Sequence, residues 1–186
     1  MYSTAEFKKG LKVELEGVPY TIVDFQHVKP GKGGAFVRTK LKSLLTGRVL
    51  DQTFRSGEKV KRPDLMEREM QYLYREGDSF CMMDNETYDQ MMLSGDQVGE
   101  VLPYLTENLT VKILFFNQQP VAVEAPLFVE LAVAQADPGM KGDTAAGGTK
   151  PATLESGLIL QVPLFINEGD RVKVDTRTGG YIERVK

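Results

Sequence analysis

An alternation of apolar and other residues with a period of two constrains the fold of this chain more than any other feature. Three stretches show it, with apolar residues at Leu109, Val111, Ile113 and Phe115, at Leu127, Val129, Leu131 and Val133, and at Leu158, Leu160, Val162, Leu164 and Ile166. Successive side chains of a β-strand point to opposite faces of the sheet, so this spacing predicts half-buried strands. The sequence therefore indicates an all-β fold.

Turn sequences separate the predicted strands at short intervals. They are Thr46-Gly47, Ser56-Gly57, Glu76-Gly77-Asp78, Glu168-Gly169-Asp170 and Gly179-Gly180. Short strands between such turns are typical of small barrels or sandwiches.

One helix is expected, capped by Ser94 and carrying apolar residues at helical spacing. These apolar residues are Val98, Val101, Leu102 and Leu105.

Charge divides the chain into three segments. Residues 1–63 hold 13 Lys and Arg against 6 Asp and Glu, a net of +7; residues 64–126 hold 3 against 12, a net of -9; residues 127–186 hold 7 against 8, a net of -1. Composition also shifts near Pro63 and Pro126, so we expect domains at 1–63, 64–126 and 127–186. The basic first segment favours a polyanionic partner such as RNA.

The residues that usually build an enzyme site are scarce. The chain has one histidine, His27, and one cysteine, Cys81, too few for a His-Cys metal cluster or a relay that needs a second histidine. We expect His27 to be half-buried and structural, and Cys81 to be an inert core thiol. We expect no metal site, no cofactor and no catalytic residue.

Targeting features are equally scarce. No apolar run approaches the roughly 20 residues of a membrane span, and the N-terminal residues lack the apolar core of a secretory signal. A single cysteine suits a reducing compartment. We therefore expect a cytoplasmic protein without a membrane partner.

A glycine-rich stretch follows the first predicted strand, Tyr20–Val28. Its residues are Lys29, Pro30, Gly31, Lys32, Gly33 and Gly34. Proline fixes one backbone angle and glycine adopts turn geometries that other residues resist, so the stretch predicts a hairpin tip. Lys32 would then be a cation with little steric bulk around it. Taken alone, the tip fits a functional probe and a solvated loop about equally.

A basic strand follows the tip. Arg38, Lys40 and Lys42 share one face by alternation, while Val37 and Leu41 point to the other. From Lys29 to Arg62 there are 10 basic residues and only two acids. We expect Arg38, Lys40 and Lys42 to contact RNA phosphates, because such contacts position a protein on RNA.

The tip resembles that of the elongation factor P family, in the run Lys29-Pro30-Gly31-Lys32-Gly33 followed by Phe36 and the basic strand. A second resemblance lies in the last segment, at Lys150-Pro151-Ala152, Gly157, Val162-Pro163, Ile166 and Gly169. The loop Asp137–Thr144 also resembles a loop of that family. More distantly, the chain is similar to the hypusine-bearing factor of eukaryotes and archaea.

The resemblance implies a KOW-type (SH3-like) barrel and two OB-fold barrels in an L-shaped, tRNA-like arrangement. It implies a monomeric, non-enzymatic elongation factor that binds both ribosomal subunits between the peptidyl-tRNA and exit sites. There it would relieve stalls at consecutive prolines, with Lys32 at the peptidyl-transferase centre beside peptidyl-tRNA and ribosomal RNA. It also implies an enzyme that modifies Lys32, and a loop that faces the messenger through Gly142, Asp143 and Thr144.

Two other functions stay open on the residues alone. A generic RNA-binding or ribosome-assembly module would explain the basic first segment equally well. An enzyme with a lysine nucleophile would need a lysine whose pKa is depressed by burial or a nearby cation, and a glycine tip offers poor desolvation. Whether Lys32 carries a group, and which one, depends on an enzyme outside this chain.

Overall fold

A computed structural model describes residues 1–139 and 148–186. The chain forms two compact units, residues 1–66 with 114–122 and residues 67–113 with 123–186. Strands dominate both units, so the predicted all-β class is confirmed.

The first unit holds a four-stranded antiparallel sheet with the order β2-β3-β4-β5 and a two-stranded sheet of β1 and β6. Their bounds are β1 Tyr2–Ser3, β2 Lys12–Leu15, β3 Val18–Val28, β4 Phe36–Ser43, β5 Val49–Arg55 and β6 Lys59–Val60, with a 3-10 helix η1 at Thr4–Glu6. The buried core is Phe7, Val13, Ile22, Val37, Leu41, Phe54 and Val60. Phe7 and Phe54 meet edge to face, with ring centroids 5.4 Å apart.

A five-stranded sheet has the order β11-β10-β7-β8-β9. Its strands are β7 Leu65–Glu76, β8 Ser79–Asp84, β9 Gln90–Ser94, β10 Thr110–Phe116 and β11 Gln119–Glu124. Val111, Ile113 and Phe115 are buried in β10, as their alternation predicts. Cys81 is also buried, 3.6 Å from Gln90 Oε1, so the expected core thiol is confirmed.

The predicted helix is present as α1 Gly95–Val98, continued by a 3-10 helix η2 at Gly99–Tyr104. The Ser94 hydroxyl accepts a hydrogen bond from the Gln97 backbone, and the Gln97 side chain accepts one from the Ser94 backbone. This capping box satisfies N–H groups that the first helical turn leaves unpaired. Val98, Val101 and Leu105 are buried as predicted, whereas Leu102 is exposed.

A second five-stranded sheet, which lies within the second unit, has the order β14-β13-β12-β15-β16. Its strands are β12 Phe128–Ala136, β13 Thr149–Leu154, β14 Ile159–Pro163, β15 Arg171–Asp175 and β16 Gly180–Val185. The core takes the alternating residues of β12, β14 and β15, and it also includes Tyr104 from η2. Leu127 was expected on the buried face but is exposed, because it lies before the first residue of β12.

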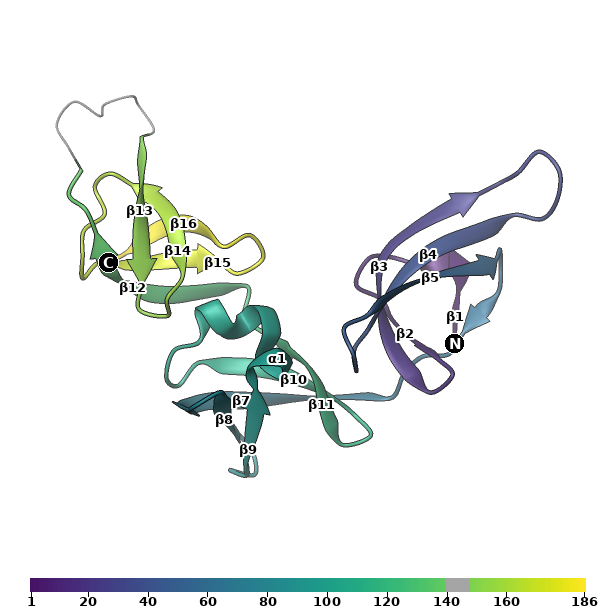
Figure 1. Cartoon of the computed structure of the whole chain (residues 1–186), viewed down its shortest axis with the longest axis horizontal. Coiled ribbons are helices and arrows are strands. Elements are labelled where there is room, and N and C mark those ends of the chain that lie inside the picture. The colour runs from purple at the N-terminus through teal and green to yellow at the C-terminus, as the bar shows by residue number, and fades with distance from the viewer. Residues whose placement is uncertain (140–147) are drawn as a thin grey trace. The chain divides into compact units, whose positions relative to one another are not determined.

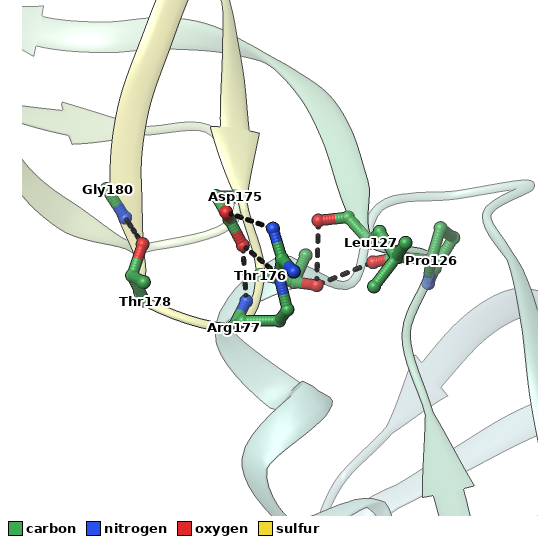
Figure 2. Close-up of polar contacts among 7 residues, drawn as sticks. All are labelled: Pro126, Leu127, Asp175, Thr176, Arg177, Thr178 and Gly180. Carbon is green, nitrogen blue, oxygen red and sulfur yellow. Dashed lines mark hydrogen bonds and ion pairs between the residues drawn. The ribbon is translucent and has the colours of Figure 1, made fainter.

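The turn between β15 and β16 is tied to the segment that precedes β12 (Figure 2). The Thr176 hydroxyl lies 2.6 Å from the Pro126 carbonyl oxygen, to which it donates, and the Thr176 backbone N–H donates to the Leu127 carbonyl. Within the turn, the Arg177 guanidinium forms an ion pair of 2.9 Å with the buried Asp175 carboxylate. The entry of the chain into the last sheet is thus fixed by polar contacts.

Candidate functional site

The glycine-rich stretch is the loop of a long antiparallel hairpin, as its sequence predicts. The β3 and β4 strands pair from Tyr20 and Ser43 up to Val28 and Phe36, and the loop leaves the hairpin there (Figure 1). Residues 29–34 are all exposed, with Lys32 in the middle. The hairpin therefore presents Lys29 and Lys32 to solvent, with Lys32 at the middle of the loop, away from the core of its own sheet.

Only one tip glycine uses a backbone conformation that other residues resist. Gly33 has a φ of +100°, whereas Gly31 and Gly34 have no positive φ. A Cβ at any of the three would meet no atom within 4 Å. Gly33 is therefore required for the turn itself, and the other two keep the surroundings of Lys32 free of side chains.

The basic strand after the tip has the predicted alternation. Val37, Thr39, Leu41 and Ser43 are buried, and Arg38, Lys40 and Lys42 are exposed on the other face of β4. The Arg38 guanidinium lies over the Phe36 ring, 5.5 Å from its centroid. This cation–π contact holds one basic group beside the start of the tip.

The neighbouring strands divide the three cations into two kinds. In the register of the sheet, Lys40 lies opposite Asp24 on β3 and Asp51 on β5. Directly opposed residues share a face, so Lys40 has a carboxylate on each side. Arg38 and Lys42 face only uncharged residues across the strands, namely Gln26, Thr53, Thr21 and Val49. This difference was not predicted from the sequence. Alternation predicts the face of the sheet on which a side chain lies, but not which residue lies opposite it on the next strand.

Aromatic residues lie on β3 near the tip. The rings of Phe25 and His27 meet edge to face, with centroids 5.7 Å apart. His27 is exposed, so the expectation of a half-buried histidine is wrong. It lies one residue before the last pair of the hairpin, opposite the buried Val37.

The expected messenger-facing residues Gly142, Asp143 and Thr144 lie outside the described residues. The two segments that flank that stretch are in contact. The buried Lys150 ammonium donates a hydrogen bond to the Asp137 backbone carbonyl. Lys150 is the first residue of the Lys150-Pro151-Ala152 motif, so the motif contributes a structural anchor at the base of this loop.

Neither a metal site nor a membrane-spanning helix is found in the part of the chain that the structure describes. Over residues 1–139 and 148–186, no three His, Cys, Asp or Glu side chains are placed to hold a metal ion. Over the same residues, no helix is long and apolar enough to cross a membrane.

Family profiles match nearly the whole chain. A profile described as the elongation factor P KOW-like domain matches residues 3–60, one for the elongation factor P OB domain matches residues 65–123, and one for the elongation factor P C-terminal region matches residues 122–184. These matches bear out the predicted KOW-like and OB-type domains.

Known proteins are similar over the same length. Elongation factor P of Natranaerobius thermophilus is 55% identical over 186 residues, covering 100% of this chain and 99% of the relative. That of Maridesulfovibrio salexigens is 55% identical over 186 residues, covering 100% of both. A solved structure of eukaryotic translation initiation factor 5A from Methanococcus jannaschii aligns with a TM-score of 0.54 and 28% identity, covering 66% of this chain and 92% of that one.

Proposed function

This chain belongs to the elongation factor P family and is a translation elongation factor, and from that premise we propose that it relieves ribosomes stalled at consecutive prolines. It binds both subunits between the peptidyl-tRNA and exit sites and positions peptidyl-tRNA with Lys32. The observation that carries this proposal is the exposed Lys32 in the middle of the β3–β4 loop, ahead of a basic strand.

The mechanism is positional. Proline is a poor nucleophile and its ring misplaces the peptidyl end, so the stalled ribosome lacks alignment of the reacting groups. A cation on a flexible stem donates hydrogen bonds to the terminal nucleotides of the tRNA and restores a near-attack geometry. A hundredfold acceleration requires only about 2.7 kcal/mol, which is within reach of a few charge-assisted hydrogen bonds.

The remaining parts of the chain support this action. Arg38, Lys40 and Lys42 bind phosphates of tRNA or ribosomal RNA, and Gly142, Asp143 and Thr144 face the messenger. Lys32 is a substrate for a lysine-modifying enzyme whose product extends its reach. The chain acts as a cytoplasmic monomer with domains at 1–63, 64–126 and 127–186.

The test is Lys32→Ala in a reconstituted translation system reading a message with three consecutive prolines. We expect the variant to lose the acceleration that the parent gives, because no other side chain lies at the middle of the loop. Lys59→Ala is the matched control, since it removes an equal charge from an exposed position on β6.

A Lys32→Ala variant that accelerates synthesis as well as the parent would overturn the proposal and favour a generic RNA-binding module. Intact mass spectrometry of the native protein, with fragments that cover Lys32, identifies the group that the lysine carries. The expected result is a mass increase confined to the fragment with Lys32.

A further inference from the structure

A second basic site lies in the first unit, outside the tip hairpin. A groove of about 630 Å³ is lined by cations from three separate stretches of the chain: Lys8 after η1, Lys12 on β2, and Arg62 after β6. Asp64 is the one acidic residue that lines it. The groove therefore carries a net charge of +2, from three cations and one carboxylate.

The cations of the groove are available to a ligand. In the ion pairs among residues 1–139 and 148–186, none involves Lys8, Lys12 or Arg62. Their sequence neighbours differ, since Lys9 pairs with Asp24 at 3.8 Å and Lys61 pairs with Glu14 at 2.8 Å. Lys9 and Lys61 thus have carboxylate partners, whereas the three lining cations form no ion pair with the described residues.

Two of the groove cations are also oriented. The Arg62 guanidinium lies over the Tyr2 ring, 5.8 Å from its centroid, and Tyr2 lines the groove as well. The Lys12 ammonium donates one hydrogen bond of 3.2 Å to the Gly10 carbonyl, which leaves two of its three N–H groups for a ligand. Such contacts reduce the conformational entropy that the side chains would lose on binding.

One cation of the groove, Lys12, lies on the same face of the sheet as the basic side chains of β4. Lys12 on β2 lies opposite Thr21 on β3, and Thr21 lies opposite Lys42 on β4. Opposed residues share a face, so Lys12 and Lys42 are on the same side of the sheet, about 10 Å apart across two strand spacings. Lys12 and the three β4 cations therefore share one face of the sheet, which also carries Asp24 and Asp51.

We propose that this groove binds backbone phosphates of folded RNA, as a second contact beyond the tip and its basic strand. The inference rests on the proposed function for the identity of the RNA, which is the tRNA or ribosomal RNA of the stalled ribosome. Arginine and lysine donors spread along a face match the repeated phosphates of a nucleic acid backbone. The groove cations come from three separate stretches of the chain, of which only Lys12 lies on the four-stranded sheet, and together with Lys42 they cover more surface than one small anion would contact.

The experiment compares Lys8→Gln/Arg62→Gln with Arg48→Gln/Lys59→Gln in the full chain. Both variants lose two positive charges from exposed positions of the first unit, but only the first pair lines the groove. Binding to a labelled RNA hairpin is measured between about 50 and 200 mM salt. We expect the slope of log K against log salt to fall in magnitude by roughly 1.4 to 1.8 for the groove variant, from about 0.7 to 0.9 for each lost contact, and by much less for the control.

A parallel titration with polyglutamate identifies the class of polyanion. Equal slopes for the groove variant and the control on RNA would overturn the proposal. A groove variant that loses polyglutamate binding while keeping its RNA slope would also overturn it, in favour of an acidic protein partner. Unchanged melting temperatures of both variants establish that neither result comes from unfolding.

Translation through three prolines separates this inference from the proposed function. The groove variant should need a higher concentration for half-maximal acceleration and reach the same maximum, whereas Lys32→Ala should lower the maximum. If the parent gives no acceleration, the proposed function fails. The RNA titration would still show whether the groove binds RNA phosphates.

Discussion

At the scale of single residues, the three exposed cations of β4 are not equivalent. Asp24 and Asp51 flank Lys40, while Arg38 and Lys42 have uncharged neighbours across the strands. We predict that Arg38→Ala and Lys42→Ala each weaken ribosome binding and reduce the salt slope by roughly 0.7 to 0.9. Lys40→Ala should change both much less, because the carboxylates of Asp24 and Asp51 opposite it weaken the attraction of its ammonium for a phosphate. The measurement is binding of labelled protein to ribosomes at several salt concentrations, and three equal losses would contradict it.

The exposed cations of β4 also show which features of the site can be predicted from the sequence. A period of two gives the exposed face of β4, because side chains must alternate along a strand. It does not give the residue opposite Lys40, because cross-strand register depends on the whole ladder. A register shift between Ile22 and Asp24 sets which β3 residues face β4, and no local feature of the sequence reports that irregularity.

At the scale of elements, local signals gave the helix and the hairpin, whereas strand ends were less well predicted. Ser94 and Gln97 form the cap of α1 because both halves of a capping box lie within four residues. The alternation through Leu164 and Ile166 predicts a longer strand than β14, which ends at Pro163. Ile166 is fully buried even so. Hydrophobic burial extends past the end of the strand, so periodicity located the core better than it located the strand end.

The β3–β4 hairpin gives a prediction about its turn. Gly33 has a φ of +100° and Gly31 does not have a positive φ, although a Cβ fits the space at both. Gly33→Ala should destabilise the loop conformation by about 1 to 2 kcal/mol. Gly31→Ala, its control, should be neutral or slightly stabilising. Hydrogen exchange at the last pairs of the hairpin should rise only in Gly33→Ala. Equal exchange in the two variants would mean that the turn does not depend on this φ.

At the scale of the whole molecule, contacts between segments far apart in the chain could not be predicted from the sequence. Tyr104 from η2 lies among the buried residues of the β12–β16 sheet, and its hydroxyl would lie 3.3 Å from a Cβ at Gly179. The sequence places Tyr104 next to Pro103 in a short helix and gives no partner for it. The groove of Lys8, Lys12 and Arg62 was missed for the same reason, because its cations come together only in the folded unit.

Two carboxylates of the second unit and one lysine of the first have pKa shifts that make stability depend on pH in opposite directions. In the second unit, hydrogen bonds from the Arg177 side chain and backbone lower the pKa of Asp175, and the Glu86 and Thr87 backbone N–H groups lower that of Asp84. A lowered folded pKa gives stability that is present above the unfolded value of about 3.9 and is lost as the pH falls through the folded value. Acid should therefore weaken the second unit.

The ion pair of Lys61 in the first unit shows the opposite pH dependence. The Lys61 ammonium donates to the nearly buried Glu14 carboxylate, and this hydrogen bond raises the pKa of Lys61. A raised folded pKa gives stability that is complete below the unfolded value of about 10.4 and is lost as the pH rises through the folded value. Lys61→Met should therefore be less stable than the parent at pH 7, and the difference should narrow in strong alkali. Asp175→Asn should also be less stable at pH 7, and its difference should narrow in acid. Hydrogen exchange resolved by unit, measured across the pH range, checks both predictions. A Lys61→Met difference that persists in strong alkali, or an Asp175→Asn difference that persists in acid, would contradict them.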